Sequence, residues 1–370
     1  RPTDLADRIA DAVATGFDVT AEVPFRVRLF RVADDEHVLV FVAHHISADG
    51  WSMAPLTRYL MTAYAARAAG GEPGWEPLPL QYADFALWQR EALGSEGDAG
   101  SPLAAQARYW QRVLADLPEE LHLPTDRARP PVQSFAGGRI AFAIDAPTHR
   151  RAAELARQNG STLFMVLHTA LAVFLARMSS SHDIAVGTAV AGRGDAALDE
   201  MVGMFVNTLV LRTRIDPGSG FADHLARVRD SDLEAFAHAE IPFERVVELL
   251  APERSTARHP LFQVALALEN LPPAGLELPG LSLAAVPFEV TTAKFDLSLT
   301  LREHTDLDGE PAGMSAELVF ARDLFDDERV DVGAGGGELA YQTLVRIPLG
   351  TVVFEELAFR GVLLALLCRR

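Results

Sequence analysis

Two adjacent histidines, His44 and His45, are the side chains of this sequence best suited to chemistry, because Asp49 and Gly50 follow them closely. Histidine can take up or release a proton near neutral pH. With 11 histidines in 370 residues, an adjacent pair is unremarkable. The aspartate and glycine at fixed offsets lower the chance expectation to roughly one in several hundred, so the pattern indicates a functional loop.

The neighbouring residues predict that this loop joins a strand to a helix. The apolar run at 37–43 predicts a buried strand, and a helical pattern begins at 51–54. Gly50 permits a sharp exit from the strand. A rigid scaffold can present a reactive group from such a loop.

Length and composition predict a globular protein with two domains or lobes. The 370 residues are enough for two cores, and a chain with 49% hydrophobic and 23% charged residues is ordinary. The net charge of −18 argues against nucleic acid or an anionic membrane surface as a partner. The single cysteine, Cys368, excludes an internal disulfide framework and a cysteine-rich zinc site, so we expect a cytoplasmic protein.

The sequence begins at Arg1, without a methionine or a signal peptide, in a segment that already predicts a helix at 5–14. We therefore expect a truncated start.

Helix and strand patterns interleave along the rest of the chain, which predicts an α/β fold. The expected strands are 25–32, 37–43, 139–144, 183–190, 209–215, 262–269, 295–302 and 314–321. The expected helices are 53–67, 82–93, 102–117, 147–158, 163–178, 221–238 and 242–250.

A proline-rich, charged crossing at 124–135 is the best candidate for a linker between two similar lobes. We expect a partial N-terminal lobe at 1–123 and a C-terminal lobe at 136–330. Residues 331–370 begin with a glycine-rich stretch and continue into an apolar helix that Glu355, Glu356 and Arg360 interrupt. This helix can span a bilayer only if those charged side chains face something other than lipid. Apart from this helix, we expect no part of the chain to contact a membrane.

Several motifs in the same order resemble the condensation domains of nonribosomal peptide synthetases. Residues 44–50 are similar to the HHxxxDG signature of that family, and residues 203–208 with Arg212 are similar to its GxFVNT…R motif. Residues 238–244 resemble HQDxPFE with two substitutions, and residues 254–263 resemble RDxSRNPLFQ with several. The YxDFAxWQ motif resembles residues 82–89. The resemblance covers roughly residues 1–330, although the earliest motifs of the family have no counterpart here.

The resemblance implies two chloramphenicol-acetyltransferase-like lobes in a V-shaped pseudo-dimer, with an incomplete N-terminal lobe. It implies peptide-bond formation between a carrier-bound aminoacyl or peptidyl thioester and the amine of a carrier-bound amino acid. Substrates would arrive on the 4'-phosphopantetheine of upstream and downstream carrier domains, next to an adenylation domain. No directly bound cofactor and no metal are implied, and the motif set favours an L-configured donor.

Roles for the loop residues follow from the same resemblance. His45 is the expected catalytic residue, acting as a base or by orienting the amine and stabilising the intermediate. His44 is expected to support the loop, and Gly50 to be conformational. Asp49 either acts on His45 directly or, as the family implies, forms an ion pair with Arg193 that holds the loop.

The other motif residues have structural interpretations as well as functional ones. Tyr82, Asp84 and Trp88 fall at helical spacing, which predicts core packing. Asn207 and Arg212 are expected to line or brace the acceptor side. His238 lies at a predicted helix end, where a dipole contact is common, and Pro242 begins the next helix, ahead of Phe243 and Glu244.

The histidine loop also fits patterns from other classes of protein. His44 and Asp49 fit an H-x4-D acyltransferase pattern, but nothing else in the chain supports a glycerolipid enzyme. Adjacent histidines on an extended segment point apart, which disfavours zinc. An epimerase relative shares the double histidine, but Gly50 favours condensation. The remaining alternative is a non-catalytic remnant or chimeric fusion.

The tail resembles a different family. Residues 355–361 are similar to the EExxxR motif of the CPBP (CAAX-processing) intramembrane proteases, through Glu355, Glu356 and Arg360. Those enzymes need later histidine motifs, and Glu356 and Arg360 lie one helical turn apart and can simply pair. We therefore expect residues 331–370 to be foreign to the condensation domain.

Overall fold

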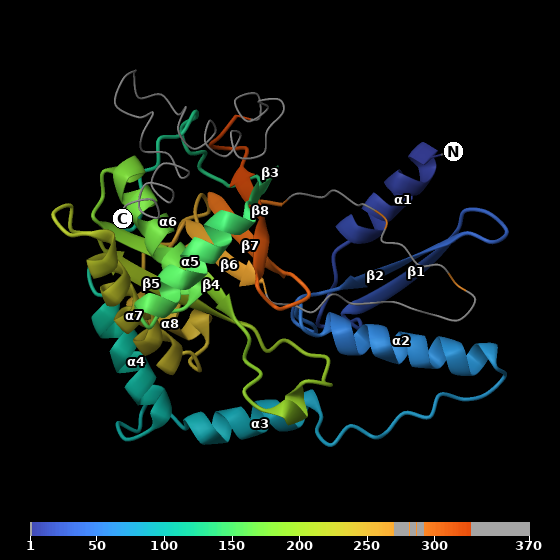
Figure 1. Ribbon diagram of the computed structural model, residues 1–370. Helices are drawn as coiled ribbons and strands as arrows, with labels where there is room; N and C mark the ends of the chain where they lie inside the picture. Colours follow the sequence, from blue (N-terminus) through green and yellow to red (C-terminus); the bar gives the residue numbers. More distant parts are fainter. Residues whose placement is uncertain (1, 270–280, 282–285, 287–291, 327–370) are drawn as a thin grey trace. The chain divides into compact units, whose positions relative to one another are not determined.

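The computed structural model describes residues 2–269, 281, 286 and 292–326, which form two compact units (Figure 1). Unit 1 contains the described residues up to Gly94 together with Ala191–Val206 and residues 281 and 286. Unit 2 contains Ser95–Val190 and residues 207–269 and 292–326. Both units mix helices and strands, which confirms the predicted α/β class. The predicted tail residues Glu355, Glu356 and Arg360 lie outside the described residues.

Unit 1 is built around one β-hairpin and three helices. Its elements are α1 (Pro2–Ala14), β1 (Phe25–Arg31), β2 (His37–Ala43), α2 (Met53–Ala68) and α3 (Tyr82–Leu93), with a short 3-10 helix, η1 (Ala196–Leu198). The hairpin is antiparallel, with Phe25 opposite Ala43 and Arg31 opposite His37. Helix α1 lies against β2. The predicted strand and helix around the histidine loop are therefore confirmed.

The prediction that 37–43 is a buried strand is wrong, because no residue of β2 is fully buried. Among the described residues, this sheet has two strands. Alternate residues of a strand point to opposite faces, so Val27 and Leu29 share one face with Leu39, and all three are exposed. Phe30 is the one buried residue of the hairpin strands, with the guanidinium of Arg8 on its ring.

Unit 2 is built on a six-stranded mixed sheet in the order β3-β8-β7-β6-β4-β5. Its strands are β3 (Gly137–Ile144), β4 (Asp183–Val190), β5 (Asn207–Arg214), β6 (Val264–Glu269), β7 (Leu297–Thr305) and β8 (Pro311–Ala321). The pairs β4–β6 and β6–β7 are parallel, and the other pairs are antiparallel. Its helices are α4 (Pro102–Val113), α5 (Ala146–Gln158), α6 (Leu163–Ser179), α7 (Phe221–Ala237) and α8 (Phe243–Leu250).

Helix α6 lies at the centre of the unit 2 core. Figure 1 shows α5 and α6 along one face of the sheet, where α5 lies against β8 and α6 against β4. Most of α6 is buried, which explains why its sequence is apolar all round. In the described part of the chain, no single helix has both the length and the apolar character needed to cross a membrane. Helices α5 and α6 together have them, but a bend of 103° separates the two.

The proline-rich crossing at 124–135 does not separate the two units, and the division before it falls at Gly94. Unit 2 holds the crossing along its length by hydrogen bonds. The backbone N–H groups of Asp126 and Arg127 donate to the Leu324 carbonyl oxygen, and that of Gln133 donates to Thr256. Proline and charge predict an extended surface segment, but they do not show what that segment binds.

Helix α4 ends at Val113, four residues before its predicted end at 117. Asp116 then adopts a left-handed conformation with φ 55°, which a continuing helix does not permit.

Gly187 tests the packing of the unit 2 core. A Cβ at this position in β4 would lie well inside contact distance of the Phe262 ring. That ring is buried and packs against Phe295 at 5.2 Å, so it has little room to move. We expect Gly187→Ala to lower the free energy of unfolding by about 1–3 kcal/mol, measured by urea denaturation. Gly218→Ala is the control, because the nearest atom to its Cβ lies at 3.5 Å. Equal effects of the two substitutions would contradict this account.

Candidate active site

The loop after β2 carries the two histidines and is anchored at its first residue. The N–H of His44 donates to the Pro24 carbonyl oxygen at 2.9 Å, and the hydroxyl of Ser47 lies 2.9 Å from the His44 carbonyl oxygen. The ring Nδ1 of His44 accepts the N–H of Ile46 at 3.1 Å, and its edge meets the Phe17 ring. The His44 imidazole is therefore used within its own loop.

His45 differs from His44 in having a free side chain. It is exposed, and within the described part of the chain it makes no hydrogen bond or ion pair. Among the described residues, neither ring nitrogen of His45 has a hydrogen-bond partner.

Asp49 is buried, and both oxygens of its carboxylate accept hydrogen bonds. Oδ1 accepts the N–H of Ser52 at 2.8 Å and lies 2.7 Å from the Ser52 hydroxyl. Oδ2 accepts the N–H of Phe205 at 3.0 Å. Nη2 of Arg193 lies 3.2 Å from Oδ1, and this side chain is also buried. The structure thus brings Asp49 and Arg193 together, and Asp49 faces this network.

The environment of Asp49 keeps its carboxylate ionised. Burial alone would raise its pKa, but the hydrogen bonds from the Ser52 hydroxyl and from the N–H groups of Phe205 and Ser52, together with the charge of Arg193, outweigh burial and lower it. A buried charge of this kind is stable only when it is fully paired.

Arg193 is itself held in one position by the segment that carries it. Nη1 donates to the carbonyl oxygens of Leu198 and, at 2.8 Å, of Met201. The guanidinium lies over the Phe205 ring, 4.1 Å from its centroid. The segment 193–205 therefore wraps around the cation that balances Asp49.

Two glycines let this segment pack closely on itself and on α3. A Cβ at Gly192 would collide with the backbone oxygen of Phe205, and one at Gly203 would collide with the Tyr82 ring. The Tyr82 hydroxyl donates to the Met204 carbonyl oxygen at 2.6 Å. Burial, with the nearby Asp49 charge, raises the pKa of Tyr82, which favours the neutral phenol that donates this bond.

The prediction of core packing for Tyr82, Asp84 and Trp88 is only partly right. Tyr82 packs against Phe85 and Phe205. Asp84 accepts the N–H of Gln81 at 2.8 Å and so caps the start of α3. The prediction is wrong for Asp84, which is exposed, and for Trp88, which is 62% exposed. Helical spacing groups residues on a face but does not show which face is covered.

Asn207 and Arg212 brace the backbone of unit 2. The Asn207 amide donates to the carbonyl oxygens of Ala239 and Ile241, and its oxygen accepts the N–H of Phe243 at 3.0 Å. Arg212 pairs with Asp183 and donates to backbone carbonyl oxygens after α4. Both side chains are used in these structural contacts.

His238 and the residues after it join α7 to α8. The His238 ring stacks on Tyr109 at 3.9 Å, and its Nδ1 lies 2.7 Å from the Glu234 carbonyl oxygen, at the end of α7 as expected. Burial, with the nearby Glu234 carboxylate, raises the pKa of Tyr109 to about 12. Pro242 is the N-cap residue of α8 and lies just before the helix.

Phe243 and Glu244 form the first turn of α8. The Phe243 ring stacks on His259, with 5.5 Å between the ring centroids. Glu244 is exposed there, where the helix dipole favours a negative charge.

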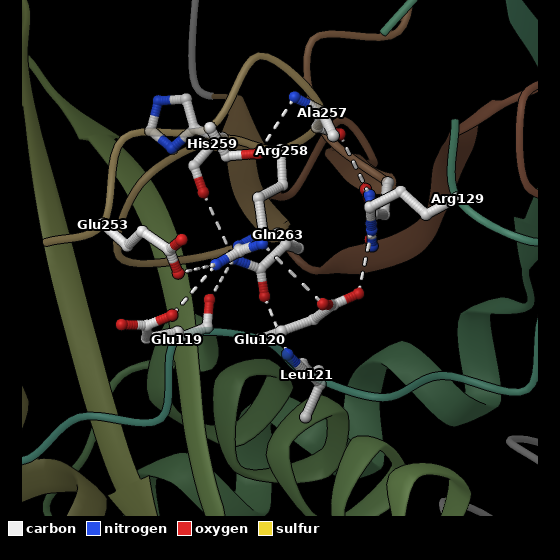
Figure 2. A network of polar contacts seen from close by, with 11 residues as sticks. Glu119, Glu120, Leu121, Arg129, Glu253, Ala257, Arg258, His259 and Gln263 are labelled. Carbon is white, nitrogen blue, oxygen red and sulfur yellow. Dashed lines mark hydrogen bonds and ion pairs between the residues drawn. The ribbon is translucent and has the colours of Figure 1, made fainter. Parts of the chain in front are cut away.

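Figure 2 shows that the motif at 254–263 forms a second polar network, in unit 2. Arg258 lies 3.1 Å from a carboxylate oxygen of Glu119, and the Gln263 side chain accepts the N–H of Leu121 at 2.8 Å. Arg129 bridges Glu120 and Asp296. These residues fasten the chain after α4 to the end of the sheet, so the motif is structural in this unit.

Sequence reasoning missed Ser52 and Phe205 as partners of Asp49. Ser52 lies three residues after Asp49 at a predicted helix start, a signal that indicates a cap more readily than a site residue. Among the described residues, no group of His, Cys, Asp or Glu is arranged to hold a metal ion.

Asp49→Asn tests the buried pair. Removing the charge leaves Arg193 buried without a counter-ion, so we expect a loss of about 3–5 kcal/mol in unfolding free energy at pH 7, measured by urea denaturation. The folded-state pKa of Asp49 lies below its ordinary 3.8. Its contribution is therefore complete above pH 3.8 and is lost as the pH falls through the folded-state value.

Asp34→Asn is the control, because Asp34 forms an exposed pair with Arg31 and should contribute less than about 1 kcal/mol. Asp49→Asn costing no more than this control would disprove the role of the pair.

Known proteins are similar to this chain in sequence and in fold. A family model described as "Condensation domain" matches residues 2–332. The dimodular nonribosomal peptide synthase of Bacillus subtilis is 48% identical over 325 residues, which is 88% of this chain and 14% of that protein. The isonitrile lipopeptide synthase of Mycobacterium tuberculosis is 46% identical over 332 residues, which is 90% of this chain and 13% of that protein. The chain thus spans only a small part of these relatives.

Solved structures show the same mixed α/β fold. The X-domain from teicoplanin biosynthesis is similar with a TM-score of 0.85 at 33% identity, over 98% of this chain and 76% of that one. The first condensation domain of the CDA synthetase shares the fold with a TM-score of 0.64 at 19% identity, over 88% of this chain and 68% of that one. With the family match over residues 2–332 and the HHxxxDG loop built around a buried Asp49, this chain belongs to the condensation domain family.

Proposed function

We propose that this chain forms peptide bonds between a thioester-bound aminoacyl or peptidyl donor and the amine of an aminoacyl acceptor. The observation that carries the proposal is the contrast within one loop. His45 is exposed, without a partner among the described residues, while Asp49, four residues later, is buried and ionised. An exposed imidazole on a loop that Asp49 fixes from within is able to meet a substrate amine.

The reaction needs an amine nucleophile and a route for its proton. The amine nitrogen attacks the thioester carbonyl carbon, and a carbon–nitrogen bond forms as the carbonyl oxygen takes the electron pair. The intermediate then collapses, the carbon–sulfur bond breaks, and the thiol leaves with the electron pair and a proton. The proton that the amine loses balances the one that the thiolate gains, so no external acid or oxidant is needed.

His45 is the group that we assign to this proton transfer or to orienting the amine. General acid–base catalysis by a positioned histidine contributes about 10²–10⁴-fold to a rate. His45 directly follows His44 in the chain, and the hydrogen bonds of His44 to Pro24 and Ile46 fix the backbone there. This fixed backbone limits the positions that the His45 imidazole can reach, which supports the role.

The partners and the lobe structure are part of the same proposal. The resemblance supports substrates delivered on 4'-phosphopantetheine arms of upstream and downstream carrier domains, with an adenylation domain adjacent, and the nonribosomal peptide synthases among the relatives support it too. We also propose that the two units correspond to the two chloramphenicol-acetyltransferase-like lobes that the resemblance implies.

His45→Ala tests the proposed function. With donor and acceptor loaded on carrier proteins, we expect the single-turnover rate of dipeptide formation to fall by about 10²–10⁴-fold, measured by mass spectrometry of the carrier-bound product. His37→Ala is the matched control, because His37 is an exposed histidine at the other end of β2 and should leave the rate unchanged.

Equal rates for the His45→Ala and unsubstituted chains would rule out the role of His45. No product at all from the folded, unsubstituted chain would favour the non-catalytic alternative.

We propose further that the tail resembling an intramembrane protease is foreign to this reaction, since the family match ends at residue 332. Removing the residues after Val330 should leave the dipeptide rate unchanged, and should remove any dependence of solubility on detergent. A large loss of rate in the shortened chain would show that the tail belongs to the domain.

A further inference from the structure

We propose that Ser52 is a positioning residue of this active site, which holds the His45 loop by binding Asp49, Arg193 and the Gly203 peptide at once. The inference rests on the proposed function for its catalytic consequence, while its structural basis is independent of that function. Ser52 lies outside the HHxxxDG signature and three residues beyond Asp49.

The Ser52 hydroxyl is the centre of the buried network. Its oxygen has two lone pairs and three donors within reach: the N–H of Gly203 at 3.1 Å, Nη2 of Arg193 at 3.1 Å and, furthest away, the N–H of Asp49 at 3.3 Å. Its single proton has two acceptors in reach, Oδ1 of Asp49 at 2.7 Å and the Gly203 carbonyl oxygen at 2.8 Å. The side chain is completely buried, so water does not replace these bonds.

The Ser52 hydroxyl does not cap the helix that follows it. Ser52 is the N-cap residue of α2, where a serine side chain ordinarily accepts a backbone N–H from the first turn. Here the side chain makes no such bond. By contrast, Ser101 at the start of α4 accepts the N–H of Ala104 at 3.1 Å. The Ser52 hydroxyl therefore serves the Asp49 network in place of its helix.

The loop between the histidines and Ser52 is short and fixed at both ends. The first end is held by the bond from the His44 N–H to Pro24, and the second by Asp49 and Ser52. His45 lies between these anchors, with Ile46 exposed beside it. Loss of the second anchor would free the loop to move His45 away from its substrate, while the first anchor remains.

The electrostatics of Asp49 agree with this geometry. Against burial, the hydroxyl of Ser52 is the leading cause that lowers the pKa of Asp49, ahead of the charge of Arg193. Removing the hydroxyl therefore raises the pKa of Asp49, so that the carboxylate becomes protonated at a higher pH than before.

Ser52→Ala tests the inference, with Ser101→Ala as the matched control. Both serines are buried N-cap residues, and Ser101 lies in unit 2 and outside the His45 loop. We expect Ser52→Ala to lower the single-turnover rate of dipeptide formation on the order of 100-fold, as a displacement of about 1 Å would. The loss of unfolding free energy in acid should begin at a higher pH in this variant, measured by urea denaturation at a series of pH values. Ser101→Ala should move neither.

A double substitution separates positioning from loss of stability. If Ser52 acts through Asp49, Ser52→Ala combined with Asp49→Asn should be no slower than the slower single variant. If the fold-reduction in the double variant equals the product of the two single fold-reductions, Ser52 acts independently of Asp49, and the inference is overturned.

Amide hydrogen exchange of the full chain decides the structural part without any activity. We expect faster exchange at residues 44–52 and at Phe205 in Ser52→Ala, and unchanged exchange there in Ser101→Ala. If the unsubstituted chain makes no dipeptide, the proposed function fails, and this exchange result alone supports or refutes the positioning role. Exchange in Ser52→Ala that matches Ser101→Ala overturns it.

Discussion

The buried carboxylate of Asp49 is the constraint on which the active-site loop depends. Taking an ionised carboxylate out of water costs several kcal/mol unless hydrogen bonds and an opposite charge replace the lost hydration. Here the replacement comes from Ser52, nearby in the chain, and from Arg193 and Phe205, which are 144 and 156 positions away. One local charge thereby requires a distant segment to fold against the loop.

That requirement explains the composition of the distant segment. Gly192 and Gly203 allow backbone and rings to approach where a Cβ would collide. Tyr82 closes the same contact from α3 through its ring and its hydroxyl. The signature loop, the YxDF helix and the GxF segment are therefore parts of one structure, and His45 lies on its exposed side, without a partner among the described residues.

The motif residues of unit 2 have a different use. Asn207, Arg212 and Gln263 all direct their polar groups to backbone atoms of chain crossings, where no helix or strand satisfies those groups. Side-chain amides and guanidinium groups suit this task because each offers several donors in a fixed geometry. Such residues hold the path of the chain around the sheet.

The sequence by itself determined the order and type of the elements, because strand and helix periodicities are local properties of neighbouring residues. It also pointed to His45, Asp49 and Arg193 through motif spacing. Only the tertiary structure decided burial: β2 and Trp88 are more exposed than their apolar character indicates, and the crossing at 124–135 belongs to unit 2. The role of Ser52 was likewise decided by contacts with Gly203, 151 positions away, since a local pattern at a helix start predicts a cap. Burial and hydrogen-bond partners depend on segments far apart in the chain, and a local pattern does not contain that information.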